Sequence, residues 1–116
     1  MNGAGLVYFA NFISFLDYAE RESLRQEGAP EALLDTRSTY WRRIGYFGNS
    51  NANDRLQITI TSRVGELNSH TMVMSFDYQL RRCSDQKKIV VSSARKVAPL
   101  DREAAAWLNR LHGRRS

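Results

Sequence analysis

Residues 9–27 read FANFISFLDYAERESLRQE, and the spacing of their apolar side chains decides the fold class. The apolar residues recur three or four positions apart, which is the period of an amphipathic α-helix. They are Phe9, Phe12, Ile13, Leu16 and Ala19, with Phe15 and Tyr18 widening the stripe. The spacing predicts a helix from about residue 10 to residue 27, capped by Asn11 and ended by Gly28 and Pro30. A stripe this wide predicts a helix that is covered on nearly all sides.

The rest of the chain is dominated by the alternating apolar and polar residues of β-strands. Residues 31–34 are expected to add one short helical turn. Strands are expected at about 38–47, 56–61, 72–79 and 89–97, with turns at 48–54, 65–69 and 84–86. After Pro99, Asp101 is a candidate N-cap for a helix over residues 104–111, which Gly113 would end. This order predicts an α+β fold with a long helix packed on one antiparallel sheet.

The length and charge of the chain bound its class. Its 116 residues suit one domain spanning residues 1–116. The 17 basic and 12 acidic residues give a net charge of +5, so the expected partners carry phosphates or carboxylates, as RNA, coenzyme A and acidic carrier proteins do. The longest apolar runs, residues 6–10 and 104–108, are far too short to span a membrane, and the N-terminus lacks the pattern of a secretion signal. A cytoplasmic protein with no membrane partner is therefore expected.

The chain offers few residues for metal or disulfide chemistry. Cys83 is the only cysteine, and His70 and His112 are the only histidines. One cysteine cannot form a disulfide within the chain, and these three residues lack the spacing of zinc ligands. The sequence therefore predicts no zinc-dependent mechanism. Cys83 is interpreted as a half-buried thiol near a hairpin turn rather than as a nucleophile.

Two parts of the chain resemble a known family. Residues 1–12, MNGAGLVYFANF, with residues 15–21, FLDYAER, resemble the loop and central helix of hotdog-fold acyl-thioester enzymes of the 4-hydroxybenzoyl-CoA thioesterase group. Residues 2–6, NGAGL, and residues 43–49, RIGYFGN, resemble more closely the hotdog halves of the leinamycin-type acyltransferase/decarboxylase and its polyketide-biosynthesis relatives.

The resemblance implies a hotdog fold, in which a curved antiparallel sheet wraps a long central helix. It implies processing of acyl-CoA or acyl-carrier-protein thioesters in polyketide-like biosynthesis, with coenzyme A or phosphopantetheine as part of the substrate and no other cofactor. It also implies a homodimer or pairing with a second hotdog half, because such enzymes bind the acyl arm between two units. A hotdog has a strand before the loop, so residues upstream of Met1 or another chain are expected to supply that edge.

The resemblance assigns catalytic roles near the start of the helix. The backbone amides of Phe9 and Gly5 would hold the thioester oxygen, and Gly3 would let the substrate approach the backbone. Phe9 also stands where unpaired amides and the helix dipole favour an oxyanion. The thioesterases have a carboxylate at the position of Asn2, whereas the leinamycin-type relatives have asparagine. An amide can orient a reacting group, but it cannot act as a carboxylate base.

Other candidate site residues follow from the side chains themselves. Glu20 and Asp17 are the acids nearest the start of the helix. Glu20 is the candidate general base, with a surface ion pair as the alternative interpretation. Tyr8 and Tyr46 are candidates for the acyl pocket, and packing in the core is their alternative.

Basic residues flank the last predicted hairpin. Arg81, Arg82 and Lys88 are candidates for contacts with the phosphates of coenzyme A or pantetheine, or with the acidic face of a carrier protein. The alternative is a solvated strand end whose charges limit pairing between sheet edges.

Two further functions stay open at this stage. A non-catalytic acyl-thioester or carrier-protein binding module would explain the missing carboxylate. An RNA-binding domain would explain the net charge and the aromatic residues Tyr40, Trp41, Tyr46 and Phe47. These aromatics are interpreted as core positions, and no stretch matches an RNA-binding motif, so nucleic acid is the less favoured partner.

Overall fold

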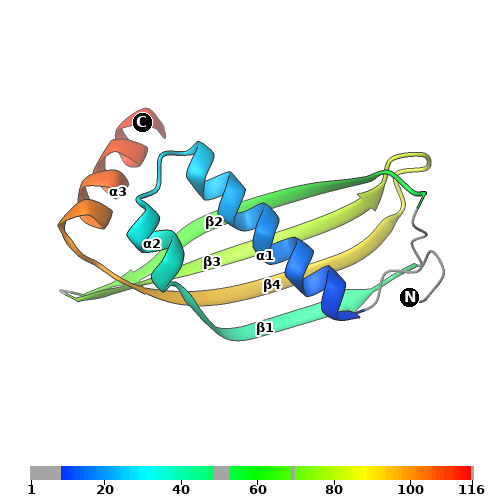
Figure 1. Cartoon of the computed structure of the whole chain (residues 1–116), viewed down its shortest axis with the longest axis horizontal. Helices are drawn as coiled ribbons and strands as arrows, with labels where there is room; N and C mark the ends of the chain where they lie inside the picture. Colours follow the sequence, from blue (N-terminus) through cyan, green and yellow to red (C-terminus); the bar gives the residue numbers. More distant parts are fainter. Residues whose placement is uncertain (1–8, 49–52, 69, 116) are drawn as a thin grey trace.

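Figure 1 shows the computed structural model, which describes residues 9–48, 53–68 and 70–115. Its elements are α1 (Phe9–Gln26), α2 (Glu31–Thr36), β1 (Ser38–Tyr46), β2 (Leu56–Leu67), β3 (Thr71–Arg82), β4 (Lys88–Pro99) and α3 (Arg102–Arg115). The order and types of these elements confirm the α+β organisation expected from the sequence.

The strands form one antiparallel sheet in the order β1-β4-β3-β2. The predicted hairpin of the last two strands is confirmed, because β3 pairs with β4 along nearly its whole length. Helix α1 lies across one face of the sheet, and α2 and α3 lie toward one end of it (Figure 1). β1 and β2 are the edge strands, and among the described residues β2 has one strand partner, β3. That residues upstream of Met1 or another chain complete this edge stays a prediction.

Helix α1 buries one narrow stripe against the sheet. The buried residues recur every four positions and are Phe12, Leu16, Glu20 and Leu24. The wider stripe expected from the sequence is wrong for the single chain, because Phe15 is 38% and Tyr18 is 63% exposed. The sheet lies on one side of α1 only (Figure 1), so the residues that widen the stripe face outward.

The face of the sheet under α1, called here the inner face, carries the apolar core. Its buried residues on β3 alternate along the strand and are Met72, Met74, Phe76, Tyr78 and Leu80. Successive side chains of a strand point to opposite faces, so Val73 and Gln79 lie on the outer face. This alternation confirms the period predicted for residues 72–79.

Helix α1 ends at a glycine with left-handed backbone geometry, as the sequence predicts. Gly28 has a φ of 88°. Its amide donates to the carbonyl of Arg25 at 2.9 Å, and the amide of Ala29 donates to the carbonyl of Leu24 at 3.0 Å. These bonds satisfy carbonyls of the last turn that have no partner within the helix.

Gly28→Ala is expected to lower the free energy of unfolding by about 1–2 kcal/mol, because an L side chain is disfavoured at this φ. Urea denaturation of the purified protein measures the change. Gly28→Asn serves as the matched variant and is expected to lose less, since asparagine tolerates the left-handed region. Equal losses for the two variants would argue against backbone strain as the cause.

Three local boundaries differ from the sequence-based expectation. Asn11 lies inside α1 and is therefore not its N-cap. β2 runs through Gly65 to Leu67, so the chain turns later than expected. α3 runs through Gly113 to Arg115. A glycine inside a helix or strand weakens the element without ending it. At Gly65 the pairing of β2 with β3 shifts register between Val64 and Leu67, and the strand then continues.

Helix α3 is anchored at its start and along its buried face. The predicted N-cap is confirmed, because Asp101 Oδ1 accepts a hydrogen bond from the amide of Ala104 at 2.8 Å. Trp107 is buried, and its Nε1 donates to the carbonyl of Glu27 at 3.0 Å. This bond ties the last helix to the end of α1. None of the described helices has the length and apolar character that crossing a membrane requires.

The aromatic residues of the first strand and the residue after it are exposed. Tyr40, Trp41, Tyr46 and Phe47 are between 39% and 66% exposed. Their interpretation as core positions is therefore wrong. The period of a strand marks its two faces, but it does not show that α1 covers only one face of the sheet or that β1 lies at its edge (Figure 1).

Candidate functional site

Several predicted site residues precede α1. Asn2, Gly3, Gly5 and Tyr8 lie outside the described residues. Phe9 is the first residue of α1. The amides of a first helical turn have no partner within the helix, and they favour negative charge that develops nearby. The assignment of a carbonyl-polarising role to the Phe9 amide stays a prediction.

Tyr46 lies beside the start of α1. It is the last residue of β1, and its ring centroid lies 5.8 Å from that of Phe12 in the first turns of the helix. The side chain is 41% exposed. Partial burial raises the pKa of the Tyr46 phenol, so the hydroxyl is neutral at physiological pH and can donate a hydrogen bond. The phenol thus stands at the edge of a site at the start of α1.

The basic residues of the β3–β4 hairpin lie at the same end of the sheet (Figure 1). Arg81 donates to the carbonyl of Gln86 at 3.0 Å and to Oε1 of Gln79 at 2.9 Å. Arg82 forms ion pairs with Asp85 at 3.1 Å and with Asp54 at 3.4 Å.

Lys88 is exposed at the start of β4. It lies two residues before Val90, the residue that pairs with Tyr46. The hairpin therefore offers Lys88 to an anionic ligand more readily than Arg82, whose charge is matched by carboxylates. Cys83 in the hairpin turn is exposed, so its interpretation as half-buried is wrong.

Glu20 lies in a buried group of charges between α1 and the inner face of the sheet. Its side chain has no exposed surface. The carboxylate accepts a hydrogen bond from the Tyr78 hydroxyl and forms an ion pair with Arg37. It also pairs with Lys96 Nζ at 2.9 Å. A carboxylate enclosed in this way holds the helix to the sheet, and a substrate cannot reach it without displacing these groups.

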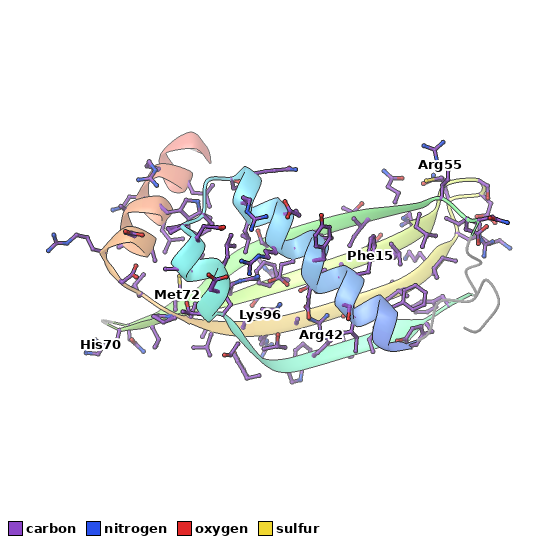
Figure 2. All side chains as sticks on the ribbon, in the orientation of Figure 1. Phe15, Arg42, Arg55, His70, Met72 and Lys96 are labelled. Atoms are coloured by element: carbon purple, nitrogen blue, oxygen red, sulfur yellow. The ribbon has the colours of Figure 1, made fainter. Side chains whose placement is uncertain are left out.

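Asp17 lies one helical turn before Glu20 and differs from it in exposure. Its Oδ1 accepts hydrogen bonds from Arg42 at 2.6 Å and from Lys96 at 3.1 Å. The Asp17 side chain is nevertheless 45% exposed. Figure 2 shows Lys96 beneath α1 and Arg42 on β1. Asp17 is thus a carboxylate that two cations hold in place at the surface.

Burial shifts the pKa values of the groups around these two carboxylates. It lowers the pKa of Lys96 to about 8, although the neighbouring Asp17 carboxylate opposes the shift. It raises the pKa of Tyr78 to about 12, with the Arg42 guanidinium opposing. It also lowers the pKa of Arg37. In each case the low polarity of the interior disfavours the charged form of the side chain, which is the phenolate of Tyr78 and the protonated form of Lys96 and Arg37.

The raised pKa of Tyr78 predicts a loss of stability at alkaline pH. The phenol ionises at its ordinary pKa of 10.0 in the unfolded chain but only at about 12 in the folded protein. The unfolded chain therefore binds fewer protons between these values, and the free energy of unfolding falls as pH rises through this window. Tyr78→Phe is expected to remove this part of the slope in denaturation measured from pH 9 to pH 12.

Tyr40→Phe is the matched control for that measurement, because Tyr40 is 56% exposed on the edge strand β1. It is expected to leave the slope unchanged. An unchanged slope in Tyr78→Phe would contradict the burial argument.

Sequence reasoning missed most of the charged group that surrounds Asp17 and Glu20. Arg37, Arg42, Tyr78 and Lys96 come from three separate parts of the chain, and the sheet register brings them together. One signal was present: position 20 continues the buried series of α1, so an acid there predicts a buried partner. Lys96 gives the same signal, because it occupies an inner-face position of β4.

Comparison with solved structures identifies the architecture. The chain superposes on a 1,4-dihydroxy-2-naphthoyl-CoA thioesterase from Synechocystis with a TM-score of 0.69 and 19% identity, over 89% of this chain and 77% of that chain. It superposes on the 4-hydroxybenzoyl-CoA thioesterase from Pseudomonas sp. strain CBS-3 with a TM-score of 0.65 and 13% identity, over 94% of this chain and 88% of that chain. The chain has the hotdog fold.

A third hotdog structure of similar shape is a thioesterase from Thermus thermophilus complexed with coenzyme A and zinc. The TM-score is 0.64 at 14% identity, over 97% of this chain and 86% of that chain. No family model and no curated protein matches the sequence. The likeness therefore establishes the hotdog fold expected from the sequence, and the chemistry has to be argued from the residues.

Proposed function

We propose that this hotdog chain hydrolyses acyl thioesters of coenzyme A or of an acyl carrier protein, and that Asp17 activates the attacking water. The observation that carries the proposal is the half-exposed Asp17 carboxylate, which Arg42 and Lys96 hold on α1. Structural neighbours that act on acyl-CoA thioesters support the choice of substrate class.

Asp17 suits the role of general base better than Glu20. A general base must reach the proton that it abstracts within hydrogen-bonding distance, directly or through one water. Asp17 presents nearly half of its side chain to solvent, whereas Glu20 presents none. Glu20 then acts as a positioning residue, because it shares Lys96 with Asp17.

The reaction needs a polarised carbonyl as well as an activated water. Asp17 accepts a proton from water while the water oxygen attacks the thioester carbon. The C–S bond then breaks, and the leaving thiolate takes the proton from Asp17 and departs as the free thiol, which restores the Asp17 carboxylate. Amides at the start of α1, with Phe9 and Gly5 as the candidates, would stabilise the negative oxygen, and Asn2 would orient the reacting group. One such donor typically contributes about 3–4 kcal/mol to lowering the barrier.

These two parts of the site are too far apart to act together within one chain. Phe9 and Asp17 are separated by about 12 Å along the helix axis at the rise of an α-helix. A two-fold dimer with antiparallel α1 helices would bring the start of one helix to Asp17 of the other, since in such a contact each residue meets its counterpart reciprocally. The exposed Phe15, Tyr18 and Tyr46 supply apolar surface suited to such an interface.

The anionic part of the substrate is assigned to the hairpin end of the sheet. Lys88 and Arg81 lie at the same end as Tyr46 and the start of α1. A phosphate of coenzyme A or phosphopantetheine, or an acidic carrier protein, would meet positive charge there. The motifs at residues 2–6 and 43–49 further suggest polyketide-type acyl groups, for which acyl transfer or decarboxylation would compete with hydrolysis.

The decisive experiment is turnover of a panel of acyl-CoA and acyl-pantetheine thioesters by the purified protein, followed by release of free thiol. Hydrolysis of at least one aryl or polyketide-like thioester is the expected result. Binding of a thioester without turnover would instead assign a non-catalytic binding module. Inertness of an intact dimer that neither binds nor hydrolyses any member of the panel would refute the proposal.

The dimeric site predicts complementation between two inactive variants. Asp17→Asn and Asn2→Ala each damage a different half of the site. After mixing and subunit exchange, half of the dimers are mixed, and each of these keeps one intact site. About a quarter of the wild-type activity is therefore expected to return. Activity that stays at the level of the separate variants would contradict a site shared between chains.

A further inference from the structure

The outer face of the sheet, opposite α1, carries two rows of polar residues that cross all four strands. One row consists of Arg63, Ser75, Arg95 and Trp41, which stand opposite one another in the register. The next row consists of Thr61, Asp77, Ser93 and Arg43. All of these residues except Thr61 line a hollow of about 210 Å³, and three of the lining residues are arginines. This face is therefore a built polar surface rather than one of scattered charges.

The outer face carries positive charge that its own acid does not neutralise. Asp77 is the acid of the two rows, and it pairs with Arg63 at 3.5 Å. Asp77 Oδ1 also accepts a hydrogen bond from the Ser93 hydroxyl at 2.7 Å. In the part of the chain that the structure describes, no carboxylate forms an ion pair with Arg43 or Arg95. Two guanidinium groups are thus left to attract an anion.

On the α1 side of the molecule, arginines are paired with acids. Arg21 pairs with Asp35, and Arg25 pairs with Glu22 and Glu31. The outer face therefore differs from the α1 side, because Arg43 and Arg95 on it have no carboxylate partner among the described ion pairs.

Two exposed aromatic rings flank Arg43 on this face. Trp41 is 39% exposed, and the guanidinium of Arg95 lies 5.0 Å from its ring centroid. Phe47 is 66% exposed. Its ring lies against Gly45, since a Cβ at Gly45 would be 3.3 Å from Phe47 Cε2.

A second hollow of about 300 Å³ adjoins the first. Phe47 and Gly45 line it, and it shares Arg43 and Ser93 with the hollow beside Trp41. The edge of the outer face therefore runs as an aromatic ring, an arginine and a second aromatic ring. Trp41 and Gly45 are about 13 Å apart along β1 at the rise of a strand.

We propose that this outer face binds single-stranded nucleic acid, with bases stacked on Trp41 and Phe47 and phosphates held by Arg43 and Arg95. Proteins that bind single strands combine basic surface with aromatic rings, on which unpaired bases stack. An acidic protein would use the arginines but would leave the Phe47 ring, and the side of the Trp41 ring that Arg95 does not cover, without a stacking partner. A single nucleotide, such as that of coenzyme A, has one base and could occupy only one of the two rings.

The proposal is independent of the proposed hydrolysis. Asp17 and the start of α1 lie on the inner side of the sheet, whereas these residues lie on the outer side. It also reverses the sequence-based interpretation of Trp41 and Phe47 as core, which had made nucleic acid the less favoured partner. The exposure of both rings is the observation that changes this interpretation.

The test is fluorescence anisotropy with a labelled oligouridine of about 12 nucleotides, measured over a series of salt concentrations. Trp41→Ala is expected to weaken binding about 10-fold. Arg43→Gln is expected to reduce the slope of log affinity against log salt by about 0.7. Arg25→Gln, on the α1 side, is the matched control and is expected to change neither. If Trp41→Ala does not fold, Phe47→Ser tests the contribution of stacking at the second ring.

Four competitors separate single-stranded nucleic acid from duplex and from other anions. Unlabelled single strand is expected to displace the probe, whereas duplex of the same length, polyglutamate of equal charge and coenzyme A are expected to displace it poorly. Equal displacement by polyglutamate, with affinity unchanged in both Trp41→Ala and Phe47→Ser, would overturn the proposal in favour of an acidic protein partner. Equal displacement by coenzyme A would show that the face binds a single nucleotide, and this result would also overturn the proposal.

Discussion

Asp17→Asn is expected to lower kcat/KM for acyl-thioester hydrolysis by about 10²- to 10⁴-fold, the usual contribution of general base catalysis. Asparagine keeps an oxygen that can accept the hydrogen bonds that Arg42 and Lys96 now donate to Oδ1. It removes the negative charge, and with it the ability to accept a proton from water. Steady-state kinetics on the best thioester of the panel measures the loss, and thermal unfolding shows whether the fold persists.

Asp77→Asn is the matched control for this loss of activity. Asp77 is also a half-exposed aspartate with an arginine partner, Arg63, but it lies on the outer face of the sheet. It is expected to leave kcat/KM unchanged. Full activity in Asp17→Asn would remove the base from the proposed mechanism. An equal loss in Asp77→Asn would show that the effect is not specific to the site.

Much of the fold was predictable because it depends on local periodicity. The four-residue recurrence of α1 and the two-residue alternation of β3 are properties of short stretches, and each predicts its element directly. The roles of Gly28 and Asp101 were predictable for the same reason, because each depends on a short stretch. Gly28 takes the left-handed conformation that ends α1, and Asp101 caps α3 through the amide of Ala104, three residues later. What these patterns do not contain is the order of the strands in the sheet.

The layering of the fold explains why the interpretation of the aromatics failed. Trp41 and Phe47 have the character of core residues. They are exposed because they lie on the outer face of the sheet, which α1 does not cover, at an edge strand (Figure 1). The same information was missing for the two acids of α1. Asp17 and Glu20 are three residues apart, and Glu20 alone of the two is in contact with Tyr78 and Arg37, which help to enclose it.

The candidate site was predictable only in part. The stretch before α1 drew attention to the start of the helix, where Phe9 does begin α1. The sequence alone favours Glu20 over Asp17, the proposed base, because the exposure of a helical side chain depends on what packs beside it. Arg42 could not be foreseen, since its contact with Asp17 joins residues 25 positions apart. Such contacts follow from tertiary packing rather than from local pattern.

Glu20→Gln is expected to lower the free energy of unfolding by about 3–5 kcal/mol, the usual cost of removing one partner from a buried ion pair. The cause is the loss of compensation for two buried cations. The side chains of Arg37 and Lys96 are 6% and 5% exposed, and Glu20 is the carboxylate that both contact. After the substitution, no other described ion pair supplies a carboxylate for Arg37, whereas Lys96 keeps its ion pair with Asp17. Urea denaturation at neutral pH measures the loss.

Glu22→Gln is the matched control, because it makes the same chemical change two positions along α1. Glu22 pairs with Arg25 at 2.5 Å, but the two side chains are 34% and 40% exposed. Solvent screens such a pair, so the expected change is within about 1 kcal/mol. If the buried charges are coupled, Glu20→Gln should also cost less in a Lys96→Met background, where one of the two cations is already absent. Equal costs for Glu20→Gln and Glu22→Gln would show that the enclosed charges do not hold α1 to the sheet.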